Sequence, residues 1–209
     1  MTQGIHPSAE IEDNVAIGNG TAVWDGVHIR HGATVGIDCI IGEKSYLGPD
    51  VVVGDLVKIN AHVYLPTGVT IERGVMIAAG ALFTNDRFPR ATDPDLRSLI
   101  TSEPTATTLP TVVREGATVG AGAVVGADLE IGRFAMIGMG SVVTRDVPAF
   151  HLVVGNPARS IAYVCRCGNP TLRFTDGPPA AELLVCEECG SRFRADDGTV
   201  TQLEDGEAG

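Results

Sequence analysis

The sequence is poor in aromatic residues, in basic residues and in long apolar runs. Aromatic side chains make up 5% of the 209 residues, so Val, Ile and Ala must supply most of the core. The net charge is −11 without any basic tract, which argues against nucleic acid or an anionic membrane surface as a partner. No run approaches the length needed to span a bilayer, and no apolar segment follows Met1. We therefore expect a soluble, cytoplasmic protein.

A strict six-residue repeat occupies most of the chain. A large apolar residue opens each block, at fourteen consecutive positions and six later ones: Ile5, Ile11, Ile17, Val23, Ile29, Val35, Ile41, Leu47, Val53, Ile59, Leu65, Ile71, Ile77, Phe83, then Val113, Val119, Val125, Ile131, Ile137 and Val143. A period of six fits neither a helix nor a long strand. It fits short strands joined by sharp corners, which is typical of a parallel β-helix.

The fourth and fifth places of each block support this interpretation. The fourth place holds Gly in nine blocks and Asn or Asp in five others, and these residue types tolerate the positive φ of a tight corner. The fifth place holds a small or β-branched residue. Cys39 occupies a fifth place, so we interpret it as a small core residue rather than a reactive thiol.

The pattern aliphatic-Gly-x-x-small-x resembles the repeats of the hexapeptide-repeat acyltransferases. The resemblance implies an all-β fold, a left-handed parallel β-helix in which three blocks form one triangular coil. Twenty blocks then give six to seven coils, between about residues 5 and 148 of an acyltransferase domain at 1–160. The resemblance also implies a homotrimer with active sites between adjacent subunits.

The repeat is interrupted at residues 84–112, which we call the inserted loop. Four prolines exclude it from the strand ladder, and a surface insertion without function is one interpretation. FTNDRFPRA at 83–91, however, resembles a signature of the acyltransferases that acetylate an amino group on a nucleotide-linked sugar, using acetyl-CoA. Examples are the UDP-2-acetamido-3-amino-glucuronate and dTDP-3-amino-hexose N-acetyltransferases. VVGNPAR at 153–159 resembles the exit sequence of the wider family.

This resemblance implies a set of catalytic and acceptor-binding residues. Asn85 would orient the sugar amine, while Asp86, Arg87 and Arg90 are candidates for binding the substrate. His62 is an alternative general base, although a solvent-facing corner residue is the simpler interpretation. One side of the triangle spans roughly 15–20 Å, so His62 and Asn85 should meet only across a subunit interface.

Acetyl-CoA, the implied co-substrate, should lie along the C-terminal coils. Gly122 and Gly140 are corners where the backbone can approach pantetheine closely, and Arg159 could meet a CoA phosphate. Each also has a plain interpretation, because glycine suits a left-handed corner and Arg159 could be a solvated exit residue.

Four of the five cysteines lie in the tail at 161–209. Cys165 and Cys167 form a C-x-C pair, and 18 residues later Cys186 and Cys189 form a C-x-x-C pair. Four thiolates on two turns are typical of a structural zinc ribbon, although the first pair is one residue short. Disulfides and thiol redox chemistry are the alternatives. Residues from about 195 onward are acidic and are expected to fray.

Other functions compete with sugar N-acetylation. O-acetylation, or acetyl transfer to another small acceptor such as a serine or drug hydroxyl, is the main alternative. A γ-class carbonic anhydrase shares the solenoid but needs three zinc-bound histidines, and no His occurs between residues 63 and 150. A non-catalytic scaffold would not need NDRFPRA at 85–91. The sequence does not identify the nucleotide, the sugar or the acetylated position.

Overall fold

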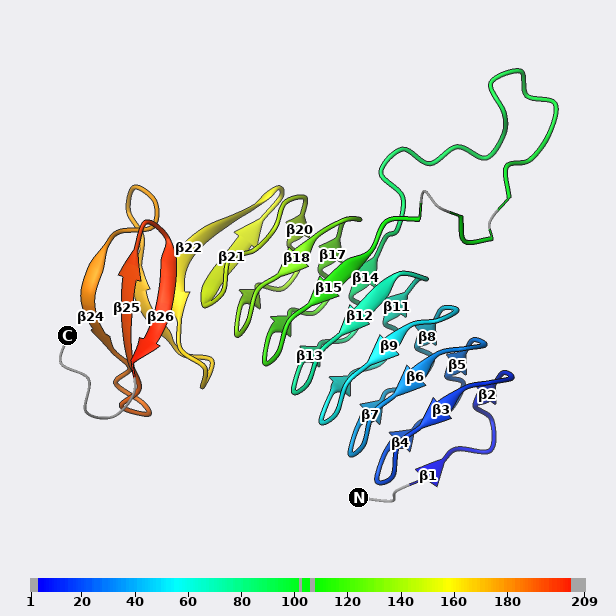
Figure 1. Ribbon diagram of the computed structural model, residues 1–209, viewed down its shortest axis with the longest axis horizontal. Helices are drawn as coiled ribbons and strands as arrows, with labels where there is room; N and C mark the ends of the chain where they lie inside the picture. Colours follow the sequence, from blue (N-terminus) through cyan, green and yellow to red (C-terminus); the bar gives the residue numbers. More distant parts are fainter. Residues whose placement is uncertain (1–3, 102, 106–107, 204–209) are drawn as a thin grey trace.

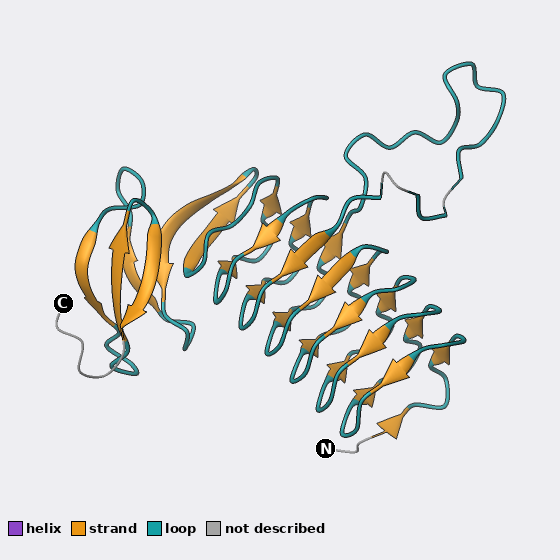
Figure 2. Cartoon of the chain, viewed as in Figure 1, coloured by secondary structure: helices purple, strands orange, loops and turns teal. Residues whose placement is uncertain are grey.

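The computed structural model describes residues 4–101, 103–105 and 108–203. These residues form 26 strands and no helix, so this part of the chain contains no helix capable of crossing a membrane. A three-sided solenoid runs from β1 to β20, and a long loop leaves it between β14 and β15 (Figures 1 and 2). Longer strands follow at the C-terminal end.

The solenoid has three parallel faces. The first consists of β1 (Gly4–Ile5), β4 (Ala22–Val23), β7 (Ile40–Ile41), β10 (Lys58–Ile59), β13 (Met76–Ile77), β16 (Thr118–Val119) and β19 (Met136–Ile137). The second consists of β2 (Glu10–Ile11), β5 (His28–Ile29), β8 (Tyr46–Leu47), β11 (Tyr64–Leu65), β14 (Leu82–Phe83), β17 (Val124–Val125) and β20 (Val142–Val143). The third consists of β3 (Ala16–Ile17), β6 (Thr34–Val35), β9 (Val52–Val53), β12 (Val69–Ile71), β15 (Thr111–Val113) and β18 (Glu130–Ile131). The described strands therefore complete six turns and two sides of a seventh, which confirms the predicted β-helix.

The core is a stack of aliphatic side chains along the solenoid axis. The second residue of each two-residue strand points inward, and Ile59 and Leu65 are fully buried. Cys39 is 1% exposed within the same cluster, which confirms its predicted core position. Fourth-place corners adopt positive φ whether they are Gly or not, as at Asp50 (φ 55°) and His62 (φ 57°). Short apolar strands and left-handed corners thus produce the coil from local preferences.

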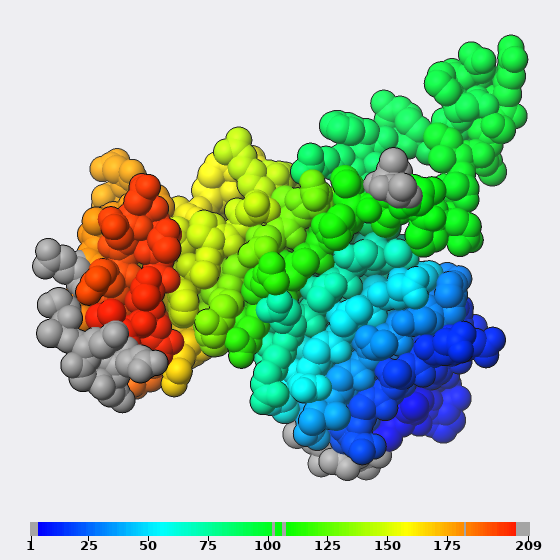
Figure 3. All heavy atoms as spheres, viewed as in Figure 1, coloured from blue at the N-terminus to red at the C-terminus, as the bar shows by residue number. Residues whose placement is uncertain are grey.

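The inserted loop leaves the stack without interrupting it. β12 before the loop pairs directly with β15 after it, and Ile71 lies opposite Val113. An ion pair joins the same coils, because the Arg114 Nη1 lies 2.8 Å from Glu72 Oε1. The loop extends from the side of the solenoid as an arm (Figure 3). The insertion therefore adds a surface to an intact coil.

Close stacking of the coils requires glycine at several places outside the left-handed corners. A Cβ built on Gly120 would lie 2.6 Å from the Ile137 carbonyl oxygen and from the Met139 nitrogen. Because both contacts are backbone, we expect Gly120→Ala to lower the free energy of unfolding by about 1–3 kcal/mol. Gly74→Asn is the matched control, since Gly74 has open space and a φ of 68° that Asn tolerates. Equal denaturant midpoints for the two variants would contradict this prediction.

The C-terminal strands extend the first face and then form a separate sheet. β21 (His151–Gly155) pairs with β19, and β22 (Ala158–Val164) and β23 (Pro170–Arg173) follow in antiparallel order. β24 (Ala181–Val185), β25 (Arg192–Asp196) and β26 (Thr199–Leu203) form an antiparallel three-stranded sheet.

The expected fraying from residue 195 is wrong as far as residue 203. β25 and β26 pair from Arg192↔Leu203 to Asp196↔Thr199. Ala195 and Leu203 are both buried, so apolar contacts order this part of the acidic tail. The remaining residues of the expected fraying end, 204–209, lie outside the described part of the chain.

Candidate functional site

One corner of the solenoid carries His62 and the two predicted cofactor glycines in a single row. The Gly80 backbone N–H donates to Ala61, that of Gly122 to Ala79, and that of Gly140 to Ala121, so the corners lie one above the next. Gly122 and Gly140 have open space where a Cβ would be. His62 is exposed at the N-terminal end of this row. This edge, between the first and second faces, offers bare backbone to a ligand.

Asn85 lies at the other edge of the second face and not beside His62. Its Nδ2 donates to the Thr67 carbonyl at 3.2 Å, which places it in the corner between the second and third faces. The Asn85 side chain therefore presents its Oδ1 as the remaining hydrogen-bonding atom. The structure thus separates the two candidate catalytic residues within one chain, as the repeat geometry predicted.

A cavity of about 610 Å³ lies beside Asn85, between the second face and the inserted loop. We call it the loop pocket. The solenoid contributes Arg30, Tyr46, Pro49, Tyr64, Pro66 and Thr67, and the inserted loop contributes Asn85, Asp86, Pro89, Ile100, Thr101, Glu103, Pro104, Thr105 and Thr108. The pocket therefore combines a rigid aromatic wall with a loop wall, and both Asn85 and Asp86 line it.

The aromatic wall follows from the repeat. Tyr46 and Tyr64 are 18 residues apart, occupy equivalent places in successive coils, and stack with ring centroids 5.0 Å apart at 9°. His28 packs edge-on against Tyr46 at 5.6 Å in the preceding coil. Burial of the Tyr64 hydroxyl raises its pKa, so this hydroxyl stays neutral and can donate a hydrogen bond.

A charged network holds Arg30 at the end of this wall. The Arg30 Nε lies 2.6 Å from Glu12 Oε1, and its Nη1 donates to the Tyr46 hydroxyl at 3.0 Å. Glu12 also accepts the His31 backbone N–H at 2.9 Å and contacts the His28 and His31 rings. The His31 N–H, followed by Arg30, lowers the pKa of Glu12 to about 2. Glu12 is therefore a carboxylate throughout the neutral range and keeps Arg30 in place.

The two predicted substrate arginines of the inserted loop do not line the pocket. The Arg87 Nη2 pairs with Asp128 Oδ2 at 2.8 Å and ties the start of the loop to a solenoid corner. The Arg90 Nη1 donates to the neighbouring Pro89 carbonyl and is exposed. Arg159, the predicted phosphate contact, is exposed on β22 and lines a smaller cavity of about 230 Å³.

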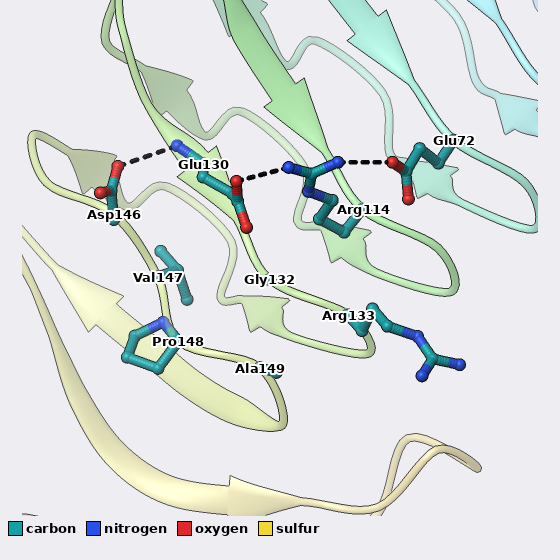
Figure 4. A pocket seen from close by; sticks show the side chains of 9 residues that line it. All are labelled: Glu72, Arg114, Glu130, Gly132, Arg133, Asp146, Val147, Pro148 and Ala149. Carbon is teal, nitrogen blue, oxygen red and sulfur yellow. Dashed lines mark hydrogen bonds and ion pairs between the residues drawn. The ribbon is translucent and has the colours of Figure 1, made fainter. Parts of the chain in front are cut away.

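A second hollow, about 760 Å³, lies on the third face (Figure 4). Arg114 points between two carboxylates there, with Nη1 2.8 Å from Glu72 Oε1 and Nη2 2.6 Å from Glu130 Oε2. Arg114 lowers the pKa of Glu130. Arg133 extends away from this group and pairs with Glu115 at 3.0 Å. These charges are paired with one another, so the hollow resembles a structural ion network more than a ligand site.

The four tail cysteines converge. All four sulfurs lie within 4.8 Å of one another, with Sγ–Sγ distances of 3.4 Å for Cys165–Cys189 and 3.6 Å for Cys167–Cys186. The four are free thiols in the structure. Tetrahedral Zn–S bonds of about 2.3 Å place the sulfurs of a zinc site about 3.8 Å apart, so this donor set fits zinc.

The two cysteine turns have the same backbone form. The Gly168 N–H donates to the Cys165 carbonyl at 2.8 Å, and the Gly190 N–H donates to the Cys186 carbonyl at 2.8 Å. The Ser191 hydroxyl and N–H lower the pKa of Cys189 to about 6, while burial raises that of Cys165 to about 12. One turn follows β22 and the other follows β24, so the cluster joins the extended first face to the terminal sheet.

Comparison with known proteins agrees with this fold. Residues 8–37 match the family model described as the hexapeptide repeat of succinyl-transferase. Together with the coil geometry, this match identifies the chain as a hexapeptide-repeat β-helix protein. A curated relative is the dTDP-3-amino-3,6-dideoxy-alpha-D-galactopyranose 3-N-acetyltransferase of Aneurinibacillus thermoaerophilus, 41% identical over 93 residues. The match covers 44% of this chain and 45% of that protein, which is less than half of either.

Solved structures with similar folds include two bacterial proteins. WeeI from Acinetobacter baumannii AYE has 27% sequence identity and a TM-score of 0.47, covering 74% of this chain and 55% of that one. AntD, an N-acyltransferase from Bacillus cereus in complex with dTDP and 3-hydroxybutyryl-CoA, has 17% identity and a TM-score of 0.47. That match covers 78% of this chain and 80% of AntD.

The sequence analysis missed Glu12, Arg30, Tyr46 and Tyr64. The two tyrosines carried a usable signal, because a separation of 18 residues is one coil and predicts stacking. Arg30 carried no such signal, since it interacts with Glu12 from the preceding coil and with Tyr46 from the following one. Whether a polar side chain at a coil surface faces a pocket depends on the inserted loop, whose path the repeat does not encode.

Proposed function

We propose that this chain is an acetyl-CoA-dependent N-acetyltransferase acting on the amino group of a nucleotide-linked amino sugar. The observation that carries the proposal is the 41% identity to a dTDP-3-amino-sugar 3-N-acetyltransferase over 93 residues. The loop pocket supports it, because Asn85 and Asp86 lie together beside an aromatic wall. The bare-backbone row at Gly122 and Gly140 supports a place for the pantetheine arm of acetyl-CoA.

The proposed chemistry is direct transfer from the thioester. The neutral amine nitrogen attacks the acetyl carbonyl carbon, the C–S bond breaks, and the departing thiolate takes the amine proton. Asn85 Oδ1 accepts one amine N–H and so aims the nitrogen lone pair, because its Nδ2 is already bonded to Thr67. Asp86, at the same edge, draws the amino group into the pocket. Arg87 and Arg90 are proposed to act on the substrate only through the position of the loop.

The two edges of one chain must meet across a subunit boundary for this reaction. The row containing His62, Gly122 and Gly140 lies at the opposite edge of the second face from Asn85. We therefore propose a homotrimer in which one subunit supplies the acceptor pocket and its neighbour the CoA edge. His62 of the neighbouring subunit is the alternative proton acceptor, and Arg159 a proposed contact for a CoA phosphate.

Sedimentation tests the trimer. We expect a mass three times the 21.8 kDa of one chain at micromolar protein. A species of one chain's mass that retains full acetyltransferase activity would overturn the shared site, because no single chain brings Asn85 to the row of glycines.

A substrate panel tests the proposed activity. UDP- and dTDP-linked amino sugars, each with acetyl-CoA, are followed by release of free thiol, and the amide product is identified by mass spectrometry. We expect release with at least one nucleotide amino sugar and none with the matching nucleotide hydroxy-sugar. Release with the hydroxy-sugar, or with simple alcohols instead of amines, would replace the proposal with O-acetylation.

The tail at 161–209 is proposed to be a structural zinc ribbon attached to an acyltransferase domain at 1–160. Cys165, Cys167, Cys186 and Cys189 would hold one zinc ion, and four thiolate ligands leave no open position for catalysis. We also propose that the protein acts in the cytoplasm, since four free clustered thiols suit a reducing compartment.

A further inference from the structure

We propose that Arg30 binds the diphosphate of the nucleotide-linked acceptor, and that Glu12 is the positioning residue that holds Arg30 for this task. The inference rests on the proposed function and names the part of the substrate that the solenoid side of the loop pocket recognises. It starts from the charges of the pocket. Among the described lining residues, Arg30 is the one cation, while Asp86 and Glu103 are acidic.

The order of charges along the pocket matches a nucleotide amino sugar. Arg30 follows β5, Tyr46 and Tyr64 lie on the next two coils, and Asn85 and Asp86 follow β14 on the third. A positive group therefore lies at one end and a carboxylate at the other. A nucleotide amino sugar carries its negative diphosphate on one side of the sugar ring and its amino group on the ring, which is the complementary order.

The spacing also fits. Successive coils are about 4.8 Å apart, and the Arg30 guanidinium reaches across one coil to the Tyr46 hydroxyl at 3.0 Å. Two further coil steps, roughly 10 Å, separate that level from Asn85. A hexose with its attached phosphate bridges a separation of this order. The exposed Tyr64 ring lies between the two ends and gives the sugar an apolar surface.

Arg30 is preorganised for an anion. Glu12 holds Nε, Tyr46 holds Nη1, and Nη2 has no partner within the described residues. The charge of Glu12 is shared with His28, with the His31 ring and with the His31 N–H, so Arg30 is only one of its donors. A guanidinium whose geometry is fixed before binding loses little side-chain freedom when it accepts a phosphate.

Calorimetric titration of dTDP, UDP, thymidine and inorganic pyrophosphate tests the inference. We expect Arg30→Met to raise the dissociation constant of dTDP or UDP, whichever the wild type binds, about 10- to 100-fold. Thymidine binding and CoA binding should stay unchanged. Arg73→Met is the matched control, because Arg73 is an exposed solenoid arginine outside the loop pocket that pairs with Asp55 at 3.7 Å. Thermal melting confirms that each variant is folded.

Glu12→Gln tests the positioning role. It should raise KM for the nucleotide sugar and leave kcat nearly unchanged, because Glu12 touches Arg30 and not the reacting atoms. If Arg30→Met binds the nucleotide as the wild type does, the inference is wrong, while acetyl transfer in the substrate panel can still hold. If wild-type protein acetylates a free amino sugar and binds neither nucleotide, the inference again fails and the N-acetyltransferase activity remains. If pyrophosphate alone responds to Arg30→Met and the nucleotides do not, the site binds another anion, and the inference is overturned.

Discussion

Asn85→Ala should lower kcat/KM for the amino-sugar acceptor by roughly 10²- to 10³-fold, the range for loss of one positioned hydrogen-bonding group. Asn85 lies at the second residue of the inserted loop, half-buried in the loop pocket, with Nδ2 anchored to Thr67. Its Oδ1 is then the atom available to orient the amine. Because alanine offers no acceptor, the amine loses its aim although the pocket remains.

CoA binding and thermal stability should hardly change in this variant, because Asn85 contributes nothing to the apolar core. Asn85→Asp is a second test, since a carboxylate keeps the acceptor oxygen but loses the donor to Thr67. His62→Ala, at the exposed corner of the other edge, should have the smaller effect. Near wild-type activity in Asn85→Ala with a large loss in His62→Ala would reverse the assignment and make His62 the base.

Cys186→Ser should remove the metal from the tail entirely and loosen the terminal sheet while leaving the solenoid folded. Metal analysis of protein purified without chelators should give one zinc per wild-type chain and none per variant chain. The reason lies in the separation of the cores. Cys165, Cys186 and Phe193 pack in a cluster of their own, and the solenoid cluster contains none of them.

Limited proteolysis shows where the variant has loosened. We expect new cleavage sites after residue 165 and none within the coils, since the solenoid keeps its own hydrogen bonds. Cys39→Ala is the matched control, because Cys39 is buried in a small slot of the coil and is remote from the cluster. Wild-type protein without zinc, or a Cys186→Ser variant with zinc still bound at one per chain, would disprove the metal site.

The tail joins the solenoid through contacts that the cysteine spacing does not reveal. Phe134 and Phe150 stack at 5.4 Å, and Phe150 contacts Phe193 of β25 at 5.4 Å. His151 accepts or donates to Ser160 at 2.8 Å and bonds the Gly198 carbonyl through Nε2 at 2.8 Å. These residues lie on coil corners and on strand turns far apart in sequence. Their convergence explains why the acidic end is ordered to residue 203 instead of fraying.

The sequence by itself determined the solenoid, its register and its core. The six-residue period alone specifies where each strand starts, which residue points inward and where a left-handed corner occurs, because each of these depends on local sterics. It also determined that a loop leaves after Phe83 and that four cysteines could share a metal. The separation of His62 from Asn85 followed from the same period.

Only the tertiary structure decided which polar residues share a pocket. NDRFPRA reads as one motif, yet Asn85 and Asp86 face the loop pocket while Arg87 pairs with Asp128 and Arg90 lies exposed. Arg30, which the sequence analysis passed over, lines the same pocket through partners from two other coils. A side chain in a non-repeating loop takes its direction from long-range contacts, and no local preference encodes those. The repeat therefore fixes the scaffold from sequence, while the site depends on how the loop returns against it.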